Sequence, residues 1–167
     1  LFYFSGIVIW NYFSDCFLKT STVFKDNAPL FGKVFFPRLV MPLAIILSSL
    51  LKFSIQFLLF VVLVVFYSFR NNSQINPTFT ILLTPLYLLL MAGLAFGTGL
   101  IIAALTTKYR DLSFLVSFGV QLLMYGSPII YSSTTINQKF KPYIQINPLT
   151  GIIESFRNAY LGTGKVE

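Results

Sequence analysis

The sequence predicts an all-α integral membrane protein, a polytopic helical bundle, and two observations support this fold class. Residues 79–105 and 112–131 are apolar runs without a charge, and only the short polar segment 106–111 separates them. A helix crosses a bilayer with roughly 20 apolar residues, whereas a core helix of a soluble protein needs no run of this length. Charged residues make up only 10% of the 167-residue chain, against about a quarter in a typical soluble domain.

The composition also excludes several other classes of protein. A net charge of +7 could indicate nucleic-acid binding, but the basic residues are scattered between apolar runs, as in the loops of membrane proteins. Cys16 is the only cysteine, so no disulfide can form within the chain. Histidine is absent, which excludes His-based metal sites and His general bases, and we expect no metal site in this chain.

We expect four spanning helices, at about residues 1–18, 43–69, 79–105 and 112–131. The first carries Trp10 and Tyr12, which suit a membrane interface, and Asp15 near its end. The second has Lys52 near its start. Because the chain begins at Leu1 rather than at Met, we expect it to be a piece of a longer protein.

The basic loop residues predict the orientation of these spans. If all four helices cross the membrane, one side holds Lys19, Lys25, Lys33, Arg38, Lys52, Lys108 and Arg110. The opposite side holds Arg70, Lys139 and Lys141. Cytoplasmic loops are enriched in Lys and Arg, so the first side is expected to be cytoplasmic.

Residues 27–42 form neither a span nor an ordinary loop. Prolines at 29, 37 and 42 prevent one continuous helix, because each removes a backbone donor and clashes with the preceding turn. Only about two helical turns fit between the first two prolines. The segment is either a helix lying on lipid headgroups or a knob that presents Phe and Lys side chains to a cytoplasmic partner.

Small residues in the third span predict close helix packing. Gly93 and Gly97, and likewise Gly99 and Ala103, have the small-xxx-small spacing that lets another helix approach closely. Packing within the chain is preferred here over contact between subunits. In the fourth span, the sequence Gly126-Ser127-Pro128 is expected to loosen or kink the helix near its outer end.

The outer tail, residues 132–167, is expected to be amphipathic rather than spanning. Asn147 and Pro148 mark the start of a helix over residues 149–161, with Ile152, Ile153, Phe156 and Tyr160 on one face. This face is apolar enough to enter the membrane interface. Glu154 and Arg157 stand three residues apart, a spacing at which they can form an ion pair.

Sequence signals for catalysis are weak. The segment 162–165, Gly-Thr-Gly-Lys, resembles the end of a phosphate-binding loop, but Ala159 replaces the required first glycine and Val166 the Ser or Thr that would hold magnesium. The five carboxylates offer no pair close enough in sequence for acid–base chemistry. We therefore expect no enzyme activity and no cofactor in this chain.

Three motifs occur in order along the chain. They are Phe35-Phe36-Pro37-Arg38, then Lys108-Tyr109-Arg110-Asp111 leading to Ser127-Pro128-Ile129-Ile130-Tyr131, and then Asn147-Pro148-Leu149-Thr150-Gly151-Ile152-Ile153-Glu154-Ser155-Phe156-Arg157. Together they resemble the membrane subunit of type-2 ABC exporters, which move polysaccharide, O-antigen or teichoic acid across the bacterial inner membrane. The resemblance covers nearly the whole chain.

The resemblance implies six spans per subunit, a homodimer and two separate ATPase subunits, which would carry the ATP and magnesium. Residues 1–167 would be a partial transmembrane domain that supplies the middle four spans. A cytoplasmic coupling segment at 27–42 would dock on the ATPase through Lys33, Val34, Phe35, Phe36, Pro37 and Arg38, with a second contact at Lys108, Tyr109, Arg110 and Asp111. Residues 135–162 would form outer gate helices, with Asn147, Pro148, Glu154 and Arg157 at the exit.

Aromatic side chains are candidates for the path of a glycan, because they can stack on the apolar faces of sugars. The candidates are Tyr12, Phe13, Phe118 and Tyr125, although contact with lipid or the core is favoured for each one taken singly. Two other function classes remain open. A secondary transporter would need ionisable groups near the bilayer midplane, and a non-transporting membrane scaffold would leave the proline-broken segment unexplained.

Overall fold

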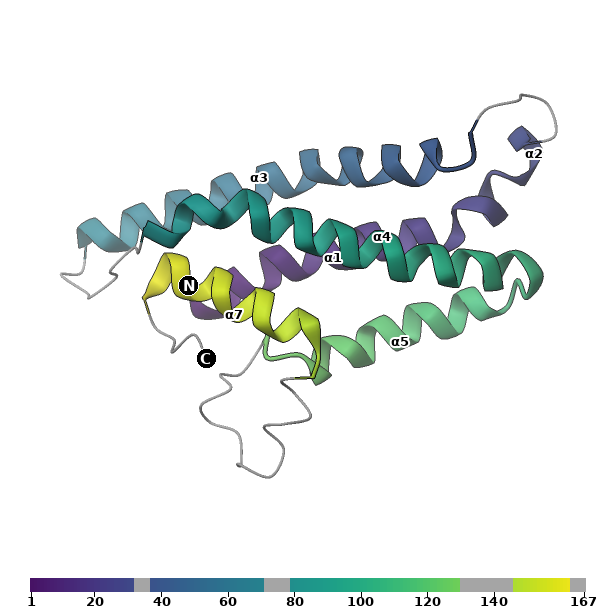
Figure 1. Cartoon of the computed structure of the whole chain (residues 1–167). Helices are drawn as coiled ribbons and strands as arrows, with labels where there is room; N and C mark the ends of the chain where they lie inside the picture. Colours follow the sequence, from purple (N-terminus) through teal and green to yellow (C-terminus); the bar gives the residue numbers. More distant parts are fainter. Residues whose placement is uncertain (32–36, 71–78, 130–145, 163–167) are drawn as a thin grey trace.

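The computed structural model describes residues 1–31, 37–70, 79–129 and 146–162, and the regular structure in these ranges is helical. The helices are α1 (Phe2–Asp26), α2 (Ala28–Phe31), α3 (Val40–Arg70), a 3₁₀ helix η1 (Phe79–Leu83), α4 (Thr84–Lys108), α5 (Leu112–Gly126) and α7 (Pro148–Leu161). The long helices lie side by side, with α1 and α4 running one way and α3 and α5 the other (Figure 1). The described part confirms the all-α fold class.

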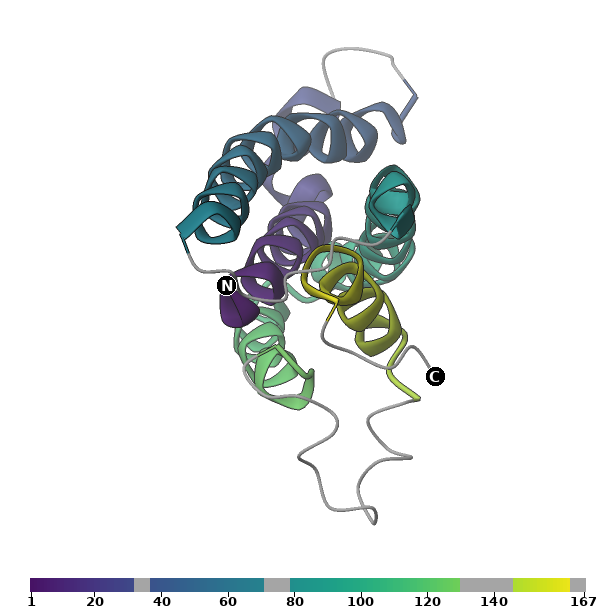
Figure 2. The same ribbon diagram turned by 90° about the vertical axis from the view of Figure 1, so that its left-hand side faces the viewer.

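Helix α1 is the centre of the bundle. Viewed along the long axis, α3, α4, α5 and α7 surround it (Figure 2), and each of them contacts it. Its buried side chains, among them Ile9, Trp10 and Cys16, occupy much of the core. α1 runs on to Asp26 rather than ending near residue 18, because Lys19 and Thr22 lie on its open face and leave the packed face uninterrupted.

Two stretches among the described residues are long and apolar enough to cross a membrane, α3 and the combined 79–108 stretch of η1 and α4. Within each of them, an 18-residue window reaches a mean hydropathy of 2.4 and 2.3, respectively. They correspond to the expected spans at 43–69 and 79–105, while spans at 1–18 and 112–131 stay predictions. Gly126-Ser127-Pro128 was expected to loosen or kink the fourth span, but α5 ends at Gly126 and is shorter than that span.

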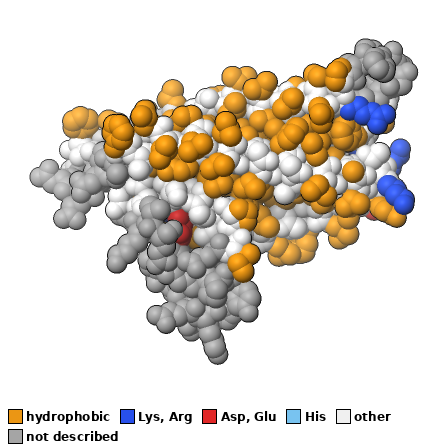
Figure 3. All heavy atoms as spheres, in the orientation of Figure 1, with side chains coloured by type: hydrophobic (Ala, Val, Ile, Leu, Met, Phe, Trp, Pro, Cys, Tyr) orange, Lys and Arg blue, Asp and Glu red, His pale blue; other side chains and the backbone are white. Residues whose placement is uncertain are grey.

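Large apolar side chains are spread along the face of the molecule seen in Figure 3, whereas the Lys and Arg side chains in this view gather at one end. Leu51 and Ile55 on α3, and Phe114 on α5, are each more than 70% exposed. A soluble monomer rarely exposes so much contiguous apolar surface, and this surface suits contact with lipid or with other membrane helices.

The small residues of α4 divide into two sets. A Cβ atom at Gly99 would lie 2.9 Å from the Thr20 side chain of α1, and Ala103 is fully buried. This pair permits the close approach of α1 and α4, as its spacing predicted. Gly93 and Gly97 have no neighbour within 4 Å of such a Cβ in the described part of the chain, so the packing expected of them within the chain is not observed there.

An aromatic cluster attaches α7 to the bundle. Phe57 and Phe60 of α3 contact Phe156 and Tyr160 of α7, with ring centroids 5.4–6.4 Å apart. The Tyr160 hydroxyl also hydrogen-bonds to that of Thr84, at 2.6 Å. The apolar face of α7 is therefore buried against protein rather than lying in the membrane interface, which corrects the expectation from its amphipathic pattern.

Candidate functional site

The basic end of the bundle holds the described part of the two expected ATPase contacts. Pro37 and Arg38 precede α3 and are exposed, and so are all four residues from Lys108 to Asp111. The structure brings these two segments to the same end, where Figure 1 shows α2 and the turn from α4 to α5. Lys33, Val34, Phe35 and Phe36 lie outside the described residues. The described residues thus form an exposed basic and aromatic surface.

Hydrogen bonds fix the turn between α4 and α5. The Tyr109 amide donates to the carbonyl of Leu105 at 2.8 Å, after which the backbone becomes extended and α4 ends. The Lys108 ammonium lies 5.3 Å from the centroid of the Tyr109 ring. Lys25, near the end of α1, donates to the Ser113 hydroxyl of α5 at 2.9 Å. The bond from Lys25 thus joins the start of α5 to the end of α1, next to this turn.

At the other end of α5, Asn147 and Pro148 set the start of α7. The Asn147 side chain accepts a hydrogen bond from the Leu149 amide at 3.1 Å and donates one to the Ser127 hydroxyl at 3.0 Å. Pro148 occupies the first turn of the helix, where its missing donor costs nothing. Both residues therefore cap α7 and join it to the end of α5. Their expected place at an exit stays a prediction.

Arg157 is buried, with 3% of its surface exposed. One guanidinium nitrogen, Nη2, donates to the carbonyls of Pro128 and Ile129 at 3.1 and 2.9 Å, and the group lies 3.8 Å above the Phe2 ring. Burial lowers the pKa of the guanidinium, while the charge of Glu154 raises it. An arginine keeps its charge in such a setting. The residue therefore joins α7 to α1 and to the end of α5, and the ion pair that its spacing from Glu154 allowed does not form.

The aromatic residues expected along a glycan path separate into two pairs. Tyr12 and Phe13 are buried in α1, where the Tyr12 ring packs edge-on against Phe53 with centroids 5.4 Å apart. Phe118 and Tyr125 on α5 are 59% and 68% exposed. Tyr12 and Phe13 therefore pack in the core between helices, which was the alternative to a glycan contact that the sequence left open. The second pair remains a candidate for contact with a glycan.

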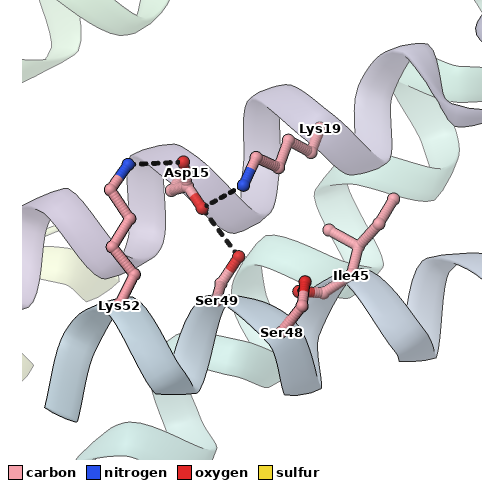
Figure 4. Close-up of polar contacts among 6 residues, drawn as sticks. All are labelled: Asp15, Lys19, Ile45, Ser48, Ser49 and Lys52. Atoms are coloured by element: carbon pink, nitrogen blue, oxygen red, sulfur yellow. Dashed lines mark hydrogen bonds and ion pairs between the residues drawn. The ribbon is translucent and has the colours of Figure 1, made fainter.

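A polar cluster between α1 and α3 was not predicted. Asp15 of α1 accepts from Lys52 and Ser49 of α3, at 3.1 and 2.7 Å, and from Lys19 one turn along its own helix, at 2.8 Å (Figure 4). The sequence reading placed Asp15 and Lys52 near span ends and did not relate them. Both lie well inside their helices. The polar residues at four-residue spacing along α1 (Asn11, Asp15, Lys19) were a signal that could have indicated this cluster.

Comparisons with known proteins indicate that the chain is similar to membrane transporters. Residues 1–161 match the family model described as ABC-2 type transporter. Two O-antigen export system permease proteins of Klebsiella pneumoniae are each 30% identical over 162 residues, which is 96% of this chain and 60% of theirs. One from Myxococcus xanthus is 26% identical over 158 residues, 93% of this chain and 58% of its own. The chain thus spans about 60% of the length of the curated relatives it matches.

Proposed function

The chain belongs to the ABC-2 type transporter family as a type-2 ABC exporter permease, and we propose that it forms part of the membrane subunit of an ATP-driven polysaccharide exporter. The observation that carries this proposal is the match of residues 1–161 to the ABC-2 type transporter family, together with the similarity of almost the whole chain to proteins named as O-antigen export system permeases. The cargo would be a polysaccharide or lipid-linked glycan, moved across the bacterial inner membrane. The chain itself would be a transport subunit rather than an enzyme.

ATP and magnesium would bind to a separate ATPase subunit, and two copies of the membrane subunit would form the exporter. The basic end of the bundle supports the contact with the ATPase, because Arg38 of the coupling segment and Tyr109 of the α4–α5 turn are both exposed there. When the ATPase subunits close on ATP, a knob held in their groove would move with them. Packed helices would transmit that movement as a rigid-body shift.

If the coupling segment docks on the ATPase, a charged residue in place of Phe35 should abolish export. Phe35→Asp places a charge in a contact expected to be apolar, which costs on the order of several kcal/mol when it is buried. In the full-length protein expressed with its ATPase, we expect export to fail and copurification of the ATPase to weaken, while membrane insertion is retained. Glycan at the cell surface and ATPase recovered on an affinity resin are the measurements.

The matched control places the same charge at the opposite end. Ile146 is 79% exposed and lies directly before the cap of α7, so Ile146→Asp should leave ATPase copurification unchanged. Normal export and normal ATPase recovery with Phe35→Asp would contradict the coupling assignment. A wild-type protein that never copurifies with an ATPase would contradict the proposed function itself.

The proposed orientation predicts which loops an impermeant reagent reaches. In a Cys16→Ser background, single cysteines at Lys33 and Tyr109 should be protected in intact cells, whereas cysteines at Gln74 and Lys139 should be labelled. Permeabilising the cells should make the first two reactive, which controls for buried thiols. Labelling at position 33 from outside intact cells would reverse the assigned orientation.

A further inference from the structure

We infer that Asp15 is a positioning residue that holds α1 and α3 together, so that the segment between them moves both helices as one body. This inference rests on the proposed function, because it concerns how ATPase movement reaches the membrane. Asp15, Ser49 and Lys52 together form the Asp15 clamp.

The geometry of the clamp shows one carboxylate serving two helices. Oδ1 of Asp15 accepts from Lys52 Nζ at 3.1 Å, and Oδ2 accepts from the Ser49 hydroxyl at 2.7 Å (Figure 4). Ser49 is 2% exposed and the Asp15 side chain 16% exposed, so the carboxylate is shielded between the two helices, whereas the Lys52 side chain is 60% exposed and reaches it from the outer surface of the bundle. Both ion pairs found among the described residues involve Asp15.

The clamp is placed to act on the coupling segment. Residues 27–39 connect the end of α1 at Asp26 to the start of α3 at Val40. Asp15 lies about 17 Å along α1 from that connection, and Lys52 about 18 Å along α3, at 1.5 Å per residue. The two helices thus form the arms of a hairpin that is tied at this distance from its tip. Because the clamp joins α1 to α3, a force on the segment that connects them cannot separate the two helices. The force therefore moves both helices together.

The depth of the clamp makes this tie strong. The Phe17 carbonyl lies beside Gly99 of α4, 3.6 Å from an added Cβ. The charge-free run of residues 79–105 ends at Leu105. Gly99 lies six residues before that end, which is about 9 Å along the helix. Since α1 and α4 run in the same direction (Figure 1), Asp15 lies about 3 Å deeper still.

At that depth, helices gain no hydrophobic attraction for one another, and ionisable groups are stable only when they are paired or face water. Of the contacts between α1 and α3, the ion pair is therefore the one whose loss costs the most free energy when the helices separate. The neighbouring contact, between the rings of Tyr12 and Phe53, can slide without leaving a charge unpaired.

The two lysines on Asp15 provide a matched pair of variants. Lys52→Gln removes the ion pair between the helices, whereas Lys19→Gln removes the one within α1 and leaves the clamp in place. In the full-length permease with its ATPase, we expect Lys52→Gln to lower the glycan exported per ATP hydrolysed by about five-fold or more, the range of ordinary coupling effects. Lys19→Gln should stay close to wild type.

An exchange of the two charges distinguishes a positioning role of Asp15 from simple destabilisation of the protein. In the Lys19→Gln background, exchanging the charges by Asp15→Lys with Lys52→Asp restores an ion pair of opposite direction and should recover most of the export per ATP. Normal coupling in Lys52→Gln would overturn the inference, and so would a charge exchange that assembles fully but stays uncoupled.

A distance measurement tests the clamp independently of transport. Spin labels at Thr22 of α1 and Leu43 of α3, in a Cys16→Ser background, report the separation of the arms near the coupling segment. We expect a broader and longer distance distribution for Lys52→Gln and a wild-type distribution for Lys19→Gln. Identical distributions in both would refute the clamp. A wild-type permease that, together with its ATPase subunit, hydrolyses no ATP and exports nothing would refute the proposed function, while the distances would still decide on the clamp.

Discussion

Replacing Arg157 by alanine should lower the free energy of unfolding by about 3 kcal/mol, because the carbonyls of Pro128 and Ile129 lose their donor in a buried place. The loss of the Phe2 contact adds to this effect. In thermal unfolding of the purified full-length protein in detergent, the expected decrease in Tm is roughly 6–12 °C. The residue stabilises the junction of three segments, so its removal should loosen all of them.

The control for Arg157 lies one turn away on the same helix. Glu154 is partly exposed, and Glu154→Ala should change stability by less than about 1 kcal/mol. The charge exchange Glu154→Arg with Arg157→Glu should be worse than Arg157→Ala, because it buries a carboxylate against two carbonyl oxygens. A charge-exchanged protein as stable as wild type would show that Arg157 does not make these buried contacts.

Gly99→Leu should be the second strongly destabilising change, by about 3 kcal/mol or more, since overpacking a close helix contact forces the backbones apart. Even a Cβ at this position lies 2.9 Å from two carbon atoms of Thr20. The separation of α1 from α4 should also break the bond from the Thr106 hydroxyl to the Ser21 carbonyl. Chemical or thermal unfolding of the purified protein measures the loss.

Gly97 provides the matched control for Gly99 because it lies on the same helix with open space around it. Gly97→Leu should change stability by less than about 1 kcal/mol. Equal losses at Gly97 and Gly99 would contradict the helix contact seen here. The comparison needs no assay of transport, so it tests the fold alone.

Helices were predicted well where a single local signal determined them. The charge-free residues 79–105 correspond to η1 and α4, and Asn147-Pro148 predicted the start of α7, which ends at Leu161 before the left-handed Gly162. Local chemistry determines these features, because a proline or a capping side chain acts within one turn.

Side-chain contacts between distant segments were not predictable in the same way. Arg157 lies three residues from Glu154, yet it bonds to carbonyls that are nearly 30 residues earlier in the sequence. The spacing of Glu154 and Arg157 indicated that they could meet, but not that burial would favour another partner. Asp15 and Lys52 were likewise read as separate span ends, because nothing in a linear pattern places two helices side by side.

The short length of α5 has a consequence for the surrounding bilayer. Its 15 residues make a helix of about 22 Å, less than the roughly 30 Å of hydrocarbon in a typical membrane. Laid across a bilayer, this flank is mismatched by several ångströms, whereas α3 is long enough to tilt. If α5 crosses the membrane as expected, lipid beside it would thin, at a fraction of a kcal/mol per ångström. Annular lipid would then be held less firmly on the α5 flank than beside α3, and a non-lipid molecule would displace it there at a lower cost.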